Sequence, residues 1–282
     1  QPSNSKFIFG SARWTRSFIK PGEGMGLAYV DWNSQEIAIA AALSGDAALW
    51  EDYYAGDIYI AFAIRAGLAP EGATKETHPE ARARCKATVL GLGYGLTENG
   101  LAKQLSIKLD AARQLVQLHH EAYPVFHRWV EQQAQAGSLG LPLRTRFHWE
   151  RRMKPGSRPN LRSLKNYYMQ ATGAEMLRLA VCELVDAGIR VCCPVHDAVL
   201  IEAEANRLDL VVAATQQIMG DVSELVLGEG YRVRTDADLV LYPDRYVDAG
   251  AGSLYATVMR IAQEADQEAA GQSLDADMPL ND

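Results

Sequence analysis

The sequence predicts an α+β fold, because segments typical of strands occur on both sides of a long helical region. Gly26–Asp31 combines apolar, aromatic and β-branched residues, the composition of a short buried strand. Two further segments of this kind flank His196 and Asp197, which places this pair at or near the tip of a hairpin. Between these regions, residues 45–140 carry helical patterns.

The residues after the first predicted strand change to a helical pattern. Ser34 is placed to cap a largely buried helix over residues 35–43, which ends at Gly45. Asp31 closes the strand, so its carboxylate is exposed but rigidly held, which suits a ligand for a hard cation such as Mg²⁺. Asp197 supplies a second carboxylate. The alternative is structural: Asp31 caps the helix and Asp197 serves a turn.

A cationic helix is predicted between the two carboxylates. Pro79 can open it, and Arg82, Lys86 and Leu90 recur every four residues on one of its faces. Tyr94 stands where glycines loosen the helix end. Carboxylates for metal and cations for phosphate together indicate phosphoryl or nucleotidyl transfer. Taken singly, Arg82 and Lys86 are equally consistent with exposed helix charges, and Tyr94 with a core aromatic.

Three ordered motifs resemble the family A DNA polymerases of the bacterial polymerase-I type. Residues 31–36, followed by the Ser-Gly-Asp at 44–46, resemble the first palm motif of that family, with the same spacing. The Arg82, Lys86, Leu90 and Tyr94 series resembles the fingers-helix motif. Residues 195–197 resemble the second palm motif, and weaker similarity extends the match from about residue 2 to about residue 248.

The resemblance implies a role for each matching residue. Asp31 and Asp197 would hold two Mg²⁺ ions for template-directed DNA synthesis. Arg82 would contact the outgoing phosphates, and Lys86 would neutralise charge or donate a proton to the pyrophosphate leaving group. Glu36 would exclude a ribose 2′-hydroxyl, and His196 would contact the primer terminus. The other predicted substrate contacts are Tyr59, Leu90 and Tyr94.

Several positions depart from the pattern of the family. Leu90 stands where the family usually has Phe or Tyr, which reduces stacking near the incoming sugar. Ala198 replaces the acid that commonly follows His-Asp, and Tyr59 replaces a His that contacts the triphosphate in many members. Ser34 replaces a common Gln. These changes resemble polymerases of phages and mobile elements more than the housekeeping enzyme.

A basic segment and a polar helix face indicate where nucleic acid would bind. Residues 144–165 contain eight Arg and Lys residues and one acid, Glu150, which suits a phosphate backbone. Arg162, Asn166 and Gln170 follow at four-residue spacing, and such a row can meet minor-groove acceptors that are nearly the same for every base pair. The structural alternatives are a solvated basic face and an ordinary polar face of a half-buried helix.

The resemblance divides the chain into segments with expected roles. The alternation in residues 141–147 predicts a strand, residues 161–187 a long helix, residues 206–227 another, and residues 231–241 a strand, while Asp110 is expected to cap a helix that ends near Tyr123. The expected division is residues 1–44, a palm segment with the first metal-binding motif; 45–140, helical fingers; 141–248, palm with the second metal-binding motif; 249–270, a C-terminal helix; and 271–282, a disordered acidic tail. Thumb and exonuclease are expected to be absent, so we expect a piece of a longer protein, with the thumb or a partner subunit supplying the duplex grip.

Bulk properties narrow the class further. The formal net charge is −7, but six acidic residues and no basic ones follow Arg260, so the preceding part carries only −1. Four cysteines, Cys85, Cys182, Cys192 and Cys193, lack Cys-x-x-Cys spacing, which favours buried free thiols in a reducing cytoplasm over a zinc site. We find no run of about 18 apolar residues and expect no membrane span.

Two other classes of function compete with the polymerase hypothesis. A non-catalytic DNA-binding or assembly subunit could keep the same fold, but the intact Asp31, Asp197, Arg82 and Lys86 argue against it. A metal-dependent nuclease would also use paired carboxylates. It has no need for Arg82, Lys86 and Tyr94 on one helix, so the helix motif separates the two. The predicted partners are therefore primer–template DNA and deoxynucleoside triphosphates.

Overall fold

A computed structural model describes residues 7–10, 12–154, 156–248 and 250–276. The chain divides into two compact units. The first comprises residues 1–30, 188–214 and 237–282, and the second comprises residues 31–187 and 215–236.

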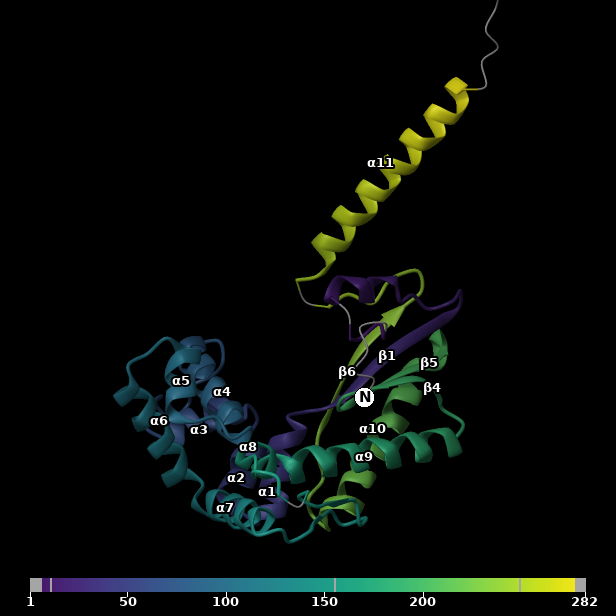
Figure 1. Cartoon of the computed structure of the whole chain (residues 1–282). Coiled ribbons are helices and arrows are strands. Elements are labelled where there is room, and N and C mark those ends of the chain that lie inside the picture. Colours follow the sequence, from purple (N-terminus) through teal and green to yellow (C-terminus); the bar gives the residue numbers. More distant parts are fainter. Residues whose placement is uncertain (1–6, 11, 155, 249, 277–282) are drawn as a thin grey trace, which may run out of the picture. The chain divides into compact units, whose positions relative to one another are not determined.

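The first unit is built on a four-stranded sheet (Figure 1). Its spatial order is β4-β5-β1-β6, and its strands are β1 (Met25–Trp32), β4 (Arg190–Val195), β5 (Ala198–Glu204) and β6 (Thr235–Leu241). Strands β4 and β5 are antiparallel and form the predicted hairpin, with Val195 opposite Ala198. A register shift between Val191 and Cys193 bends β4. The segments with the composition of strands therefore form strands of this sheet.

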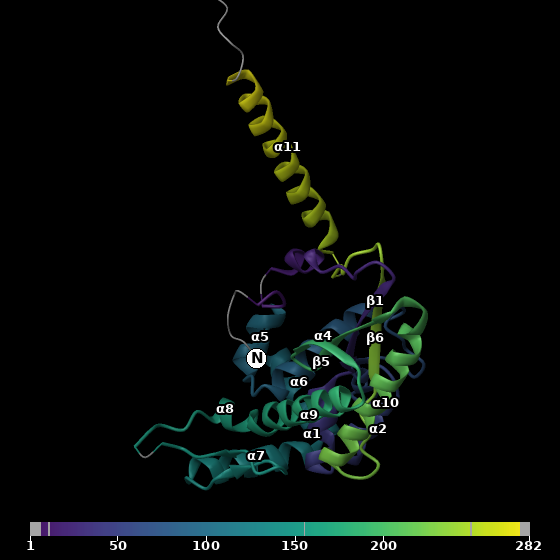
Figure 2. The same cartoon turned by 90° about the vertical axis from the view of Figure 1, so that its right-hand side faces the viewer.

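A compact apolar cluster covers this sheet. Phe9, Leu27, Val195, Leu200 and Tyr246 are buried together, and the rings of Phe9 and Tyr246 meet edge to face with centroids 5.8 Å apart. The short helix η1 (Arg13–Phe18) packs against α11 (Gly252–Ala276), the long helix drawn in yellow in Figure 2. Another short helix, η2 (Ala205–Arg207), follows β5. The helix α11 runs past the predicted end at residue 270, because residues 271–276 continue its helical turns.

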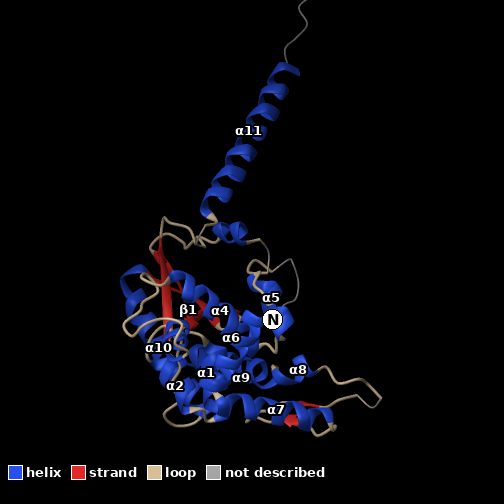
Figure 3. Ribbon diagram, turned by 90° about the vertical axis from the view of Figure 1, so that its left-hand side faces the viewer, coloured by secondary structure: helices blue, strands red, loops and turns tan. Residues whose placement is uncertain are grey.

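The second unit is almost entirely helical (Figure 3). Its helices are α1 (Gln35–Ser44), α2 (Ala47–Tyr54), α3 (Ile58–Arg65), α4 (Pro79–Gly93), α5 (Glu98–Leu105), α6 (Leu109–Ala122), α7 (Pro124–Ser138), α8 (Leu161–Lys165) and α9 (Tyr167–Asp186). One small antiparallel hairpin joins α7 to α8 and consists of β2 (Leu143–Arg144) and β3 (Glu150–Arg151). The predicted helical block over residues 45–140 is thus present, and α5 is a helix that the sequence patterns did not single out.

Local capping explains where several of these helices begin. Asp46 accepts a hydrogen bond from the backbone N–H of Leu49 and so caps α2. Asp57 accepts from the N–H groups of Tyr59 and Ile60 and caps α3. Pro79 stands at the first turn of α4, as predicted, where its missing N–H costs nothing. Short polar residues before apolar runs therefore set the helix register of this unit.

Buried polar contacts connect the helices of the second unit. The second carboxylate oxygen of Asp46 accepts from the N–H groups of Val125 and Phe126, which joins the start of α2 to the start of α7. The guanidinium of Arg65 forms a bidentate ion pair with Asp52, with distances of 2.6 and 2.7 Å, and the hydroxyl of Tyr123 also donates to Asp52 at 2.7 Å. Buried charges of this kind are stable only when they are fully partnered.

The helix α10 (Leu208–Leu227) contributes residues to both units. Residues Ala205–Leu227 form the one helix in the described part of the chain that is long and apolar enough to cross a membrane. However, 44% of its apolar window is buried inside the protein, and a core helix passes the same test. Leu208, Met219, Val222 and Val226 are among the buried residues that explain its apolar composition.

Four local predictions were wrong. Ser34 takes a left-handed conformation with φ of 50° and makes no side-chain cap, so it ends the strand-to-helix turn without capping α1. Asp110 lies inside the first turn of α6, and Lys108 holds the cap position. The predicted strand at 141–147 shrinks to β2. The predicted helix at 161–187 is divided at Asn166, which lies between α8 and α9.

Candidate active site

The end of β1, which carries Asp31, is anchored on both sides. The indole Nε1 of Trp32 donates to the carbonyl of Met219 at 3.2 Å, and the backbone N–H of Asn33 donates to the carbonyl of Arg234 at 2.8 Å. Trp32 is completely buried. Because the residues directly after Asp31 are fixed in this way, its carboxylate is held at a rigid strand end, as the sequence predicted.

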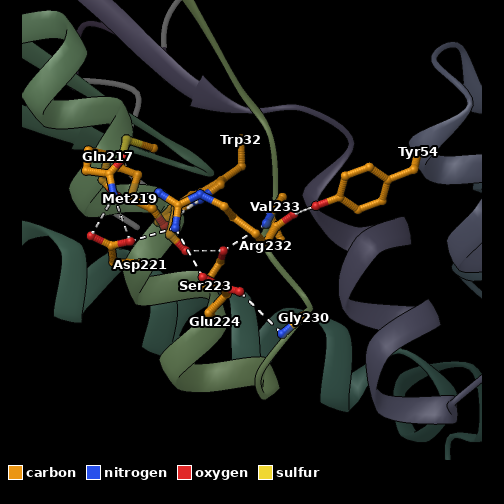
Figure 4. Close-up of polar contacts among 11 residues, drawn as sticks. Trp32, Tyr54, Gln217, Met219, Asp221, Ser223, Glu224, Gly230, Arg232 and Val233 are labelled. Carbon is orange, nitrogen blue, oxygen red and sulfur yellow. Dashed lines mark hydrogen bonds and ion pairs between the residues drawn. The ribbon is translucent and has the colours of Figure 1, made fainter.

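Arg232 organises the loop that supplies this anchor (Figure 4). Its guanidinium donates to Asp221 at 2.6 Å and to Glu224 at 3.1 Å, both on α10. Its carbonyl accepts a hydrogen bond from the hydroxyl of Tyr54 on α2. Ser223 accepts from the N–H of Val233 at 2.8 Å. The loop after α10 is therefore attached to two helices before it reaches Asn33.

Asp197 lies in the two-residue turn between β4 and β5, as predicted. His196, the first residue of this turn, has a positive φ of 56°, which two-residue hairpin loops require at that position. Val195 and Ala198 pair on either side of the turn and are both buried. Asp197 belongs to the first unit and Asp31 to the second. The pairing of the two carboxylates is therefore part of the proposal below.

Arg82 and Lys86 project from α4 onto one aromatic ring. The guanidinium carbon of Arg82 lies 5.4 Å from the centroid of the Tyr59 ring, and the ammonium of Lys86 lies 5.6 Å from it. Asp57, one turn away at the start of α3, accepts a hydrogen bond from Nε of Arg82 at 2.5 Å. Cation–π contact and the ion pair together fix the direction of both cations.

The ring of Tyr59 packs against these two cations and is itself buried. Only 8% of its surface is exposed. Burial raises the pKa of its phenol, although a hydrogen bond with the Ser34 side chain and the nearby charge of Arg82 act against the rise. The phenol of Tyr59 is therefore uncharged where its ring contacts the two cations. Tyr59 packs against Arg82 and Lys86 and also lines the polar hollow beside Arg82, and its predicted contact to triphosphate stays a prediction.

A polar hollow of about 610 Å³ opens beside Arg82. Its walls come from the loop after β1, the start of α3, the segment before α4 and the loop after α10. The cations Lys75, Arg82 and Arg234 line it together with Asn33 and Ser34. A hollow with several cations and small polar residues suits a phosphorylated ligand.

Glu36 joins three segments of the second unit. Its carboxylate accepts one hydrogen bond from the hydroxyl of Tyr94, at the end of α4, and another from the side-chain amide of Gln170 on α9. The sequence separates Gln170 from Glu36 by 134 residues, so no local pattern could indicate this contact. The residues proposed for sugar selection and for base-pair checking are thus in direct contact.

The predicted row of Arg162, Asn166 and Gln170 spans the break between α8 and α9. Nε of Arg162 donates to the carbonyl of Tyr94 at 3.0 Å, which brings α8 against the end of α4. Gly95 has a φ of 71°, and a Cβ there would lie 3.3 Å from the Arg162 backbone. Only glycine combines that conformation with this close approach. The row therefore borders the end of the cationic helix.

Leu90 lines a small apolar hollow of about 30 Å³, together with Glu36, Asn166 and His119. His119 is 2% exposed, and its Nδ1 is 2.7 Å from Nε2 of His127. Burial lowers the pKa of His119, and burial lowers that of His127 to about 3. Both imidazoles are neutral at pH 7. A side chain larger than leucine at position 90 would fill part of this hollow.

The basic segment predicted to bind nucleic acid is partly neutralised within itself. Glu150 contacts Arg144 at 2.5 Å and also pairs with Arg152, and Lys165 pairs with Glu131. Both arginines are more than half exposed, at 53% and 65%, so solvent screens these pairs. Arg151 and Arg162 also make hydrogen bonds within the protein, to Ser163 and to the carbonyl of Tyr94, whereas Arg146 is exposed to solvent.

The cysteines do not all fit the prediction of buried thiols. Cys85 is buried, and burial raises its pKa to about 11, so this thiol is inert. Cys182 and Cys192 are exposed, and Cys193 is half-buried. Strand β4 and the outer face of α9 present these residues to solvent, which corrects the expectation. Within the described ranges, no group of three or more His, Cys, Asp or Glu side chains is placed to hold a metal.

Cations beside a polar hollow suit the binding of a phosphorylated substrate. The family comparison defines the class further. The family model described as DNA polymerase family A matches residues 10–239, and the chain belongs to this family.

Relatives of known identity include bacterial and phage polymerases. The chain is 28% identical over 224 residues to a thermostable DNA polymerase I of Thermus thermophilus, covering 74% of this chain and 26% of that protein. It is 28% identical over 221 residues to DNA polymerase I of Chloroflexus aurantiacus, covering 73% and 23%. A DNA polymerase of Mycobacterium phage D29 is 29% identical over 203 residues, covering 69% and 32%. The chain therefore spans about a quarter to a third of the length of these relatives.

The fold is similar to that of a solved polymerase domain. The POL domain of Pol1 from M. smegmatis, in a complex with DNA primer-template and dNTP, superposes with a TM-score of 0.68 at 26% identity. The match covers 80% of this chain and 41% of that one. The predicted recognition of a family A polymerase is confirmed, and the fold is that of a polymerase domain.

Proposed function

We propose that this chain carries the nucleotidyl-transfer part of a DNA-directed DNA polymerase, which extends a primer 3′-hydroxyl with deoxynucleotides and releases pyrophosphate. One observation carries the proposal most directly. Arg82 and Lys86 are fixed on the ring of Tyr59, and Arg82 lines a polar hollow of about 610 Å³ together with Ser34, which follows Asp31 closely in sequence. A phosphate chain in that hollow would meet cations on one side and the strand end on the other.

The residues present fit Mg²⁺. Asp31 at the end of β1 and Asp197 in the β4–β5 turn would hold two ions, because Mg²⁺ takes one or two carboxylates and completes its shell with water and phosphate oxygens. When bound, the ions activate the attacking hydroxyl and stabilise charge on the phosphates. The donor chemistry needs no third protein ligand.

Arg82 and Lys86 bind and neutralise the phosphates. Asp57 holds the guanidinium of Arg82 in one orientation, so its remaining N–H groups are directed before the substrate arrives. Lys86 carries protons that it can donate to the departing pyrophosphate. Tyr59 keeps both side chains extended along one ring.

Glu36 selects the sugar in this proposal. Its carboxylate is fixed by Tyr94 and Gln170, so it cannot rotate away from a ribose 2′-hydroxyl. Leu90 lies beside Glu36 around the small hollow and would contact the sugar with less area than an aromatic ring. The carboxylate therefore sets sugar selection largely without help from stacking.

The DNA contacts fall on the remaining predicted residues. Asn166 and Gln170 would face the minor groove at the new base pair, Arg162 the template backbone, and His196 the primer terminus. The helical second unit corresponds to fingers with part of the palm, and the sheet corresponds to palm. A thumb, or a partner subunit in its place, would grip the duplex, and the protein would act in the cytoplasm.

Primer extension with isosteric variants tests the proposal. A labelled primer–template, Mg²⁺ and four deoxynucleotides are incubated with the chain, with Asp31→Asn and with Asp197→Asn. The matched control is Asp186→Asn, an exposed acid at the end of α9. Extension by the parent and the control, and its loss in both site variants, is the expected result.

Failure of the parent to extend primers at low salt, where backbone contacts are strongest, would overturn self-sufficient catalysis. DNA binding without extension would favour a non-catalytic DNA-binding or assembly subunit with a polymerase fold. Extension that survives either site substitution would remove that carboxylate from the proposed metal site.

A further inference from the structure

The β2–β3 hairpin displays two aromatic rings to solvent. Phe147 is 50% exposed and Trp149 is 45% exposed, although large aromatic side chains usually bury most of their surface. Both stand in the loop between Arg144 and Glu150, the paired ends of the two short strands. The chain therefore places apolar rings on the surface within its most basic segment.

Hydrogen bonds hold the backbone of Trp149 in place. Its N–H donates to the hydroxyl of Thr145 at 3.0 Å, and its carbonyl accepts from the N–H of Thr145 at 3.1 Å. The same carbonyl accepts from the hydroxyl of Tyr167 at 2.7 Å. Thr145 is itself buried and donates to the buried carboxylate of Glu175 on α9. The exposed ring of Trp149 is therefore attached to a backbone that hydrogen bonds hold in place.

A hollow of about 300 Å³ lies next to this ring. Trp149 and Tyr167 supply aromatic walls, and Ser163, Asn166 and Gln170 supply hydrogen-bonding groups. The volume is at the lower end of the range for sites that hold small ligands, about 300–1,000 Å³. One planar ring with polar edges fits such a space. Asn166 and Gln170 also belong to the row proposed to contact DNA.

One arginine lies against each of the two aromatic walls. The guanidinium of Arg178 lies 4.7 Å from the centroid of the Trp149 ring, and that of Arg151 lies 5.8 Å from the centroid of Tyr167. Arg151 is further oriented by Ser163, whose hydroxyl and carbonyl accept from it at 2.9 Å. Exposed Arg146 lies in the same loop. This combination of stacking rings and cations is the pattern by which proteins bind single-stranded nucleic acid.

We propose that Trp149, supported by Tyr167, forms a stacking site for an unpaired base of single-stranded DNA, the template strand ahead of the primer. The bases of a duplex are already stacked on one another and cannot enter the hollow. An unpaired base can place its face on Trp149 and its edge toward Ser163, while the cations meet the flanking phosphates. The inference rests on the proposed function, which supplies a template strand.

Binding to two matched DNA substrates tests the inference. Fluorescence anisotropy compares a primer–template with a 5′ single-stranded overhang and a blunt duplex of the same paired length. The Trp149→Ala variant should bind the overhang substrate roughly 5- to 100-fold more weakly and the blunt duplex unchanged. Trp149→Tyr should restore most of the affinity, because it keeps an aromatic face. Phe18→Ala, which removes a ring of similar exposure (51%) from the first unit, is the control and should change neither.

Two further measurements separate stacking from charge. Abasic sites placed one at a time along the overhang should weaken the parent at one position and leave Trp149→Ala unaffected there, as a double-mutant cycle requires. The salt dependence of binding should be the same for Trp149→Ala and the parent. Arg146→Ala should lower the slope by about 0.7, the value for one phosphate contact to a single strand.

Equal overhang affinity of Trp149→Ala and the parent would overturn the stacking site, as would equal loss on overhang and blunt DNA or the absence of any DNA binding. In the second case the hairpin would be a general duplex contact, and in the third a surface for another protein. Primer extension is measured on the same preparations. Binding that depends on Trp149 without extension would overturn the catalytic proposal and leave the stacking site standing.

Discussion

Arg82 on α4 donates a hydrogen bond to Asp57 at the start of α3, over 2.5 Å. The same aspartate accepts hydrogen bonds from the N–H groups of Tyr59 and Ile60, so one carboxylate both begins a helix and orients a cation that is proposed to bind phosphate. The side chains of Arg82 and Asp57 are 29% and 22% exposed, which leaves the guanidinium accessible to a ligand. This pair connects the fold of the second unit to its proposed chemistry.

Replacing Asp57 separates these two roles. Asp57→Asn keeps an acceptor for the helix cap but removes the charge that orients Arg82, so we expect kcat/KM for deoxynucleotides to fall roughly 10-fold, about 1.4 kcal/mol, with little change in melting temperature. Asp57→Ala should add a loss of about 1 kcal/mol in unfolding free energy from the missing cap. Steady-state primer extension and thermal unfolding measure the two effects. An unaltered kcat/KM in Asp57→Asn would show that Arg82 needs no orientation by Asp57.

The contact between Tyr94 and Glu36 predicts a change in sugar selection. Tyr94→Phe removes the hydroxyl that donates to Glu36 and keeps the hydrogen bond from Gln170 to that carboxylate. The freed carboxylate should reject ribonucleotides less well, by roughly 3- to 10-fold in the ratio of kcat/KM values, from the loss of one hydrogen bond. Competition between deoxy- and ribonucleotides in primer extension measures this ratio.

The matched control for this variant is Tyr54→Phe. It removes a hydroxyl that donates to the carbonyl of Arg232, outside the proposed sugar contact. The loss of this one hydrogen bond should lower the unfolding free energy of Tyr54→Phe by about 0.5–1.5 kcal/mol, without any change in sugar selection. Equal selection in Tyr94→Phe and Tyr54→Phe would remove the hydroxyl of Tyr94 from the selection mechanism.

The sequence predicted the elements of the site better than their contacts. β1, α4 and the β4–β5 turn follow local patterns: an apolar run, a four-residue spacing after Pro79, and two β-rich segments around His196. The ion pair of Arg82 with Asp57 and the contact of Glu36 with Gln170 join residues 25 and 134 positions apart. Such contacts depend on tertiary packing, which a period of hydrophobicity does not encode.

The boundaries that failed have physical reasons too. Asn166 keeps near-helical angles, φ of −89° and ψ of −7°, so the apolar pattern continues across the break between α8 and α9. The alternation over residues 141–147 is real, with Leu143 and Thr145 buried, yet only two residues pair with β3. Helix α5 begins at a Thr97 cap beside glycines, and its short apolar face was hidden by polar residues.

The buried histidines of α6 and α7 predict a dependence of stability on pH. Burial lowers the pKa of His127 to about 3, whereas in the unfolded chain it is about 6.5. Between these values the unfolded state binds more protons than the folded state, so stability rises with pH across this window and falls as the pH drops below about 6.5. Each such group contributes a slope of up to about 1.4 kcal/mol per pH unit.

Urea unfolding between about pH 5 and pH 6.5, which lies between these two pKa values, checks this slope, and measurements up to about pH 8 should show that it levels off. His127→Gln keeps an acceptor for His119 but cannot titrate, so the slope should decrease by part of one group. His148→Asn is the control, because His148 is exposed and has a positive φ of 65° that Asn tolerates. A slope that is the same in His127→Gln and the parent would contradict a neutral, buried His127.

Gly220 on α10 predicts a steric test of the loop that anchors Asn33. A Cβ at this position would collide with the guanidinium of Arg232, which holds Asp221 and Glu224. Gly220→Ala should therefore lower the unfolding free energy by about 1–3 kcal/mol, as overpacking does. Gly93→Ala, in α4, meets open space and should stabilise the helix by about 0.5–1 kcal/mol.

The loss in Gly220→Ala should shrink when Arg232 is replaced as well. Arg232→Met removes the charged fork, so the double variant should be more stable than the sum of the single effects, with an interaction energy of at least about 0.5 kcal/mol. Chemical unfolding of the four proteins in this cycle gives that energy directly. Strict additivity would mean that the guanidinium of Arg232 does not lie over Gly220, and Arg232 would then not be packed against α10 at this position.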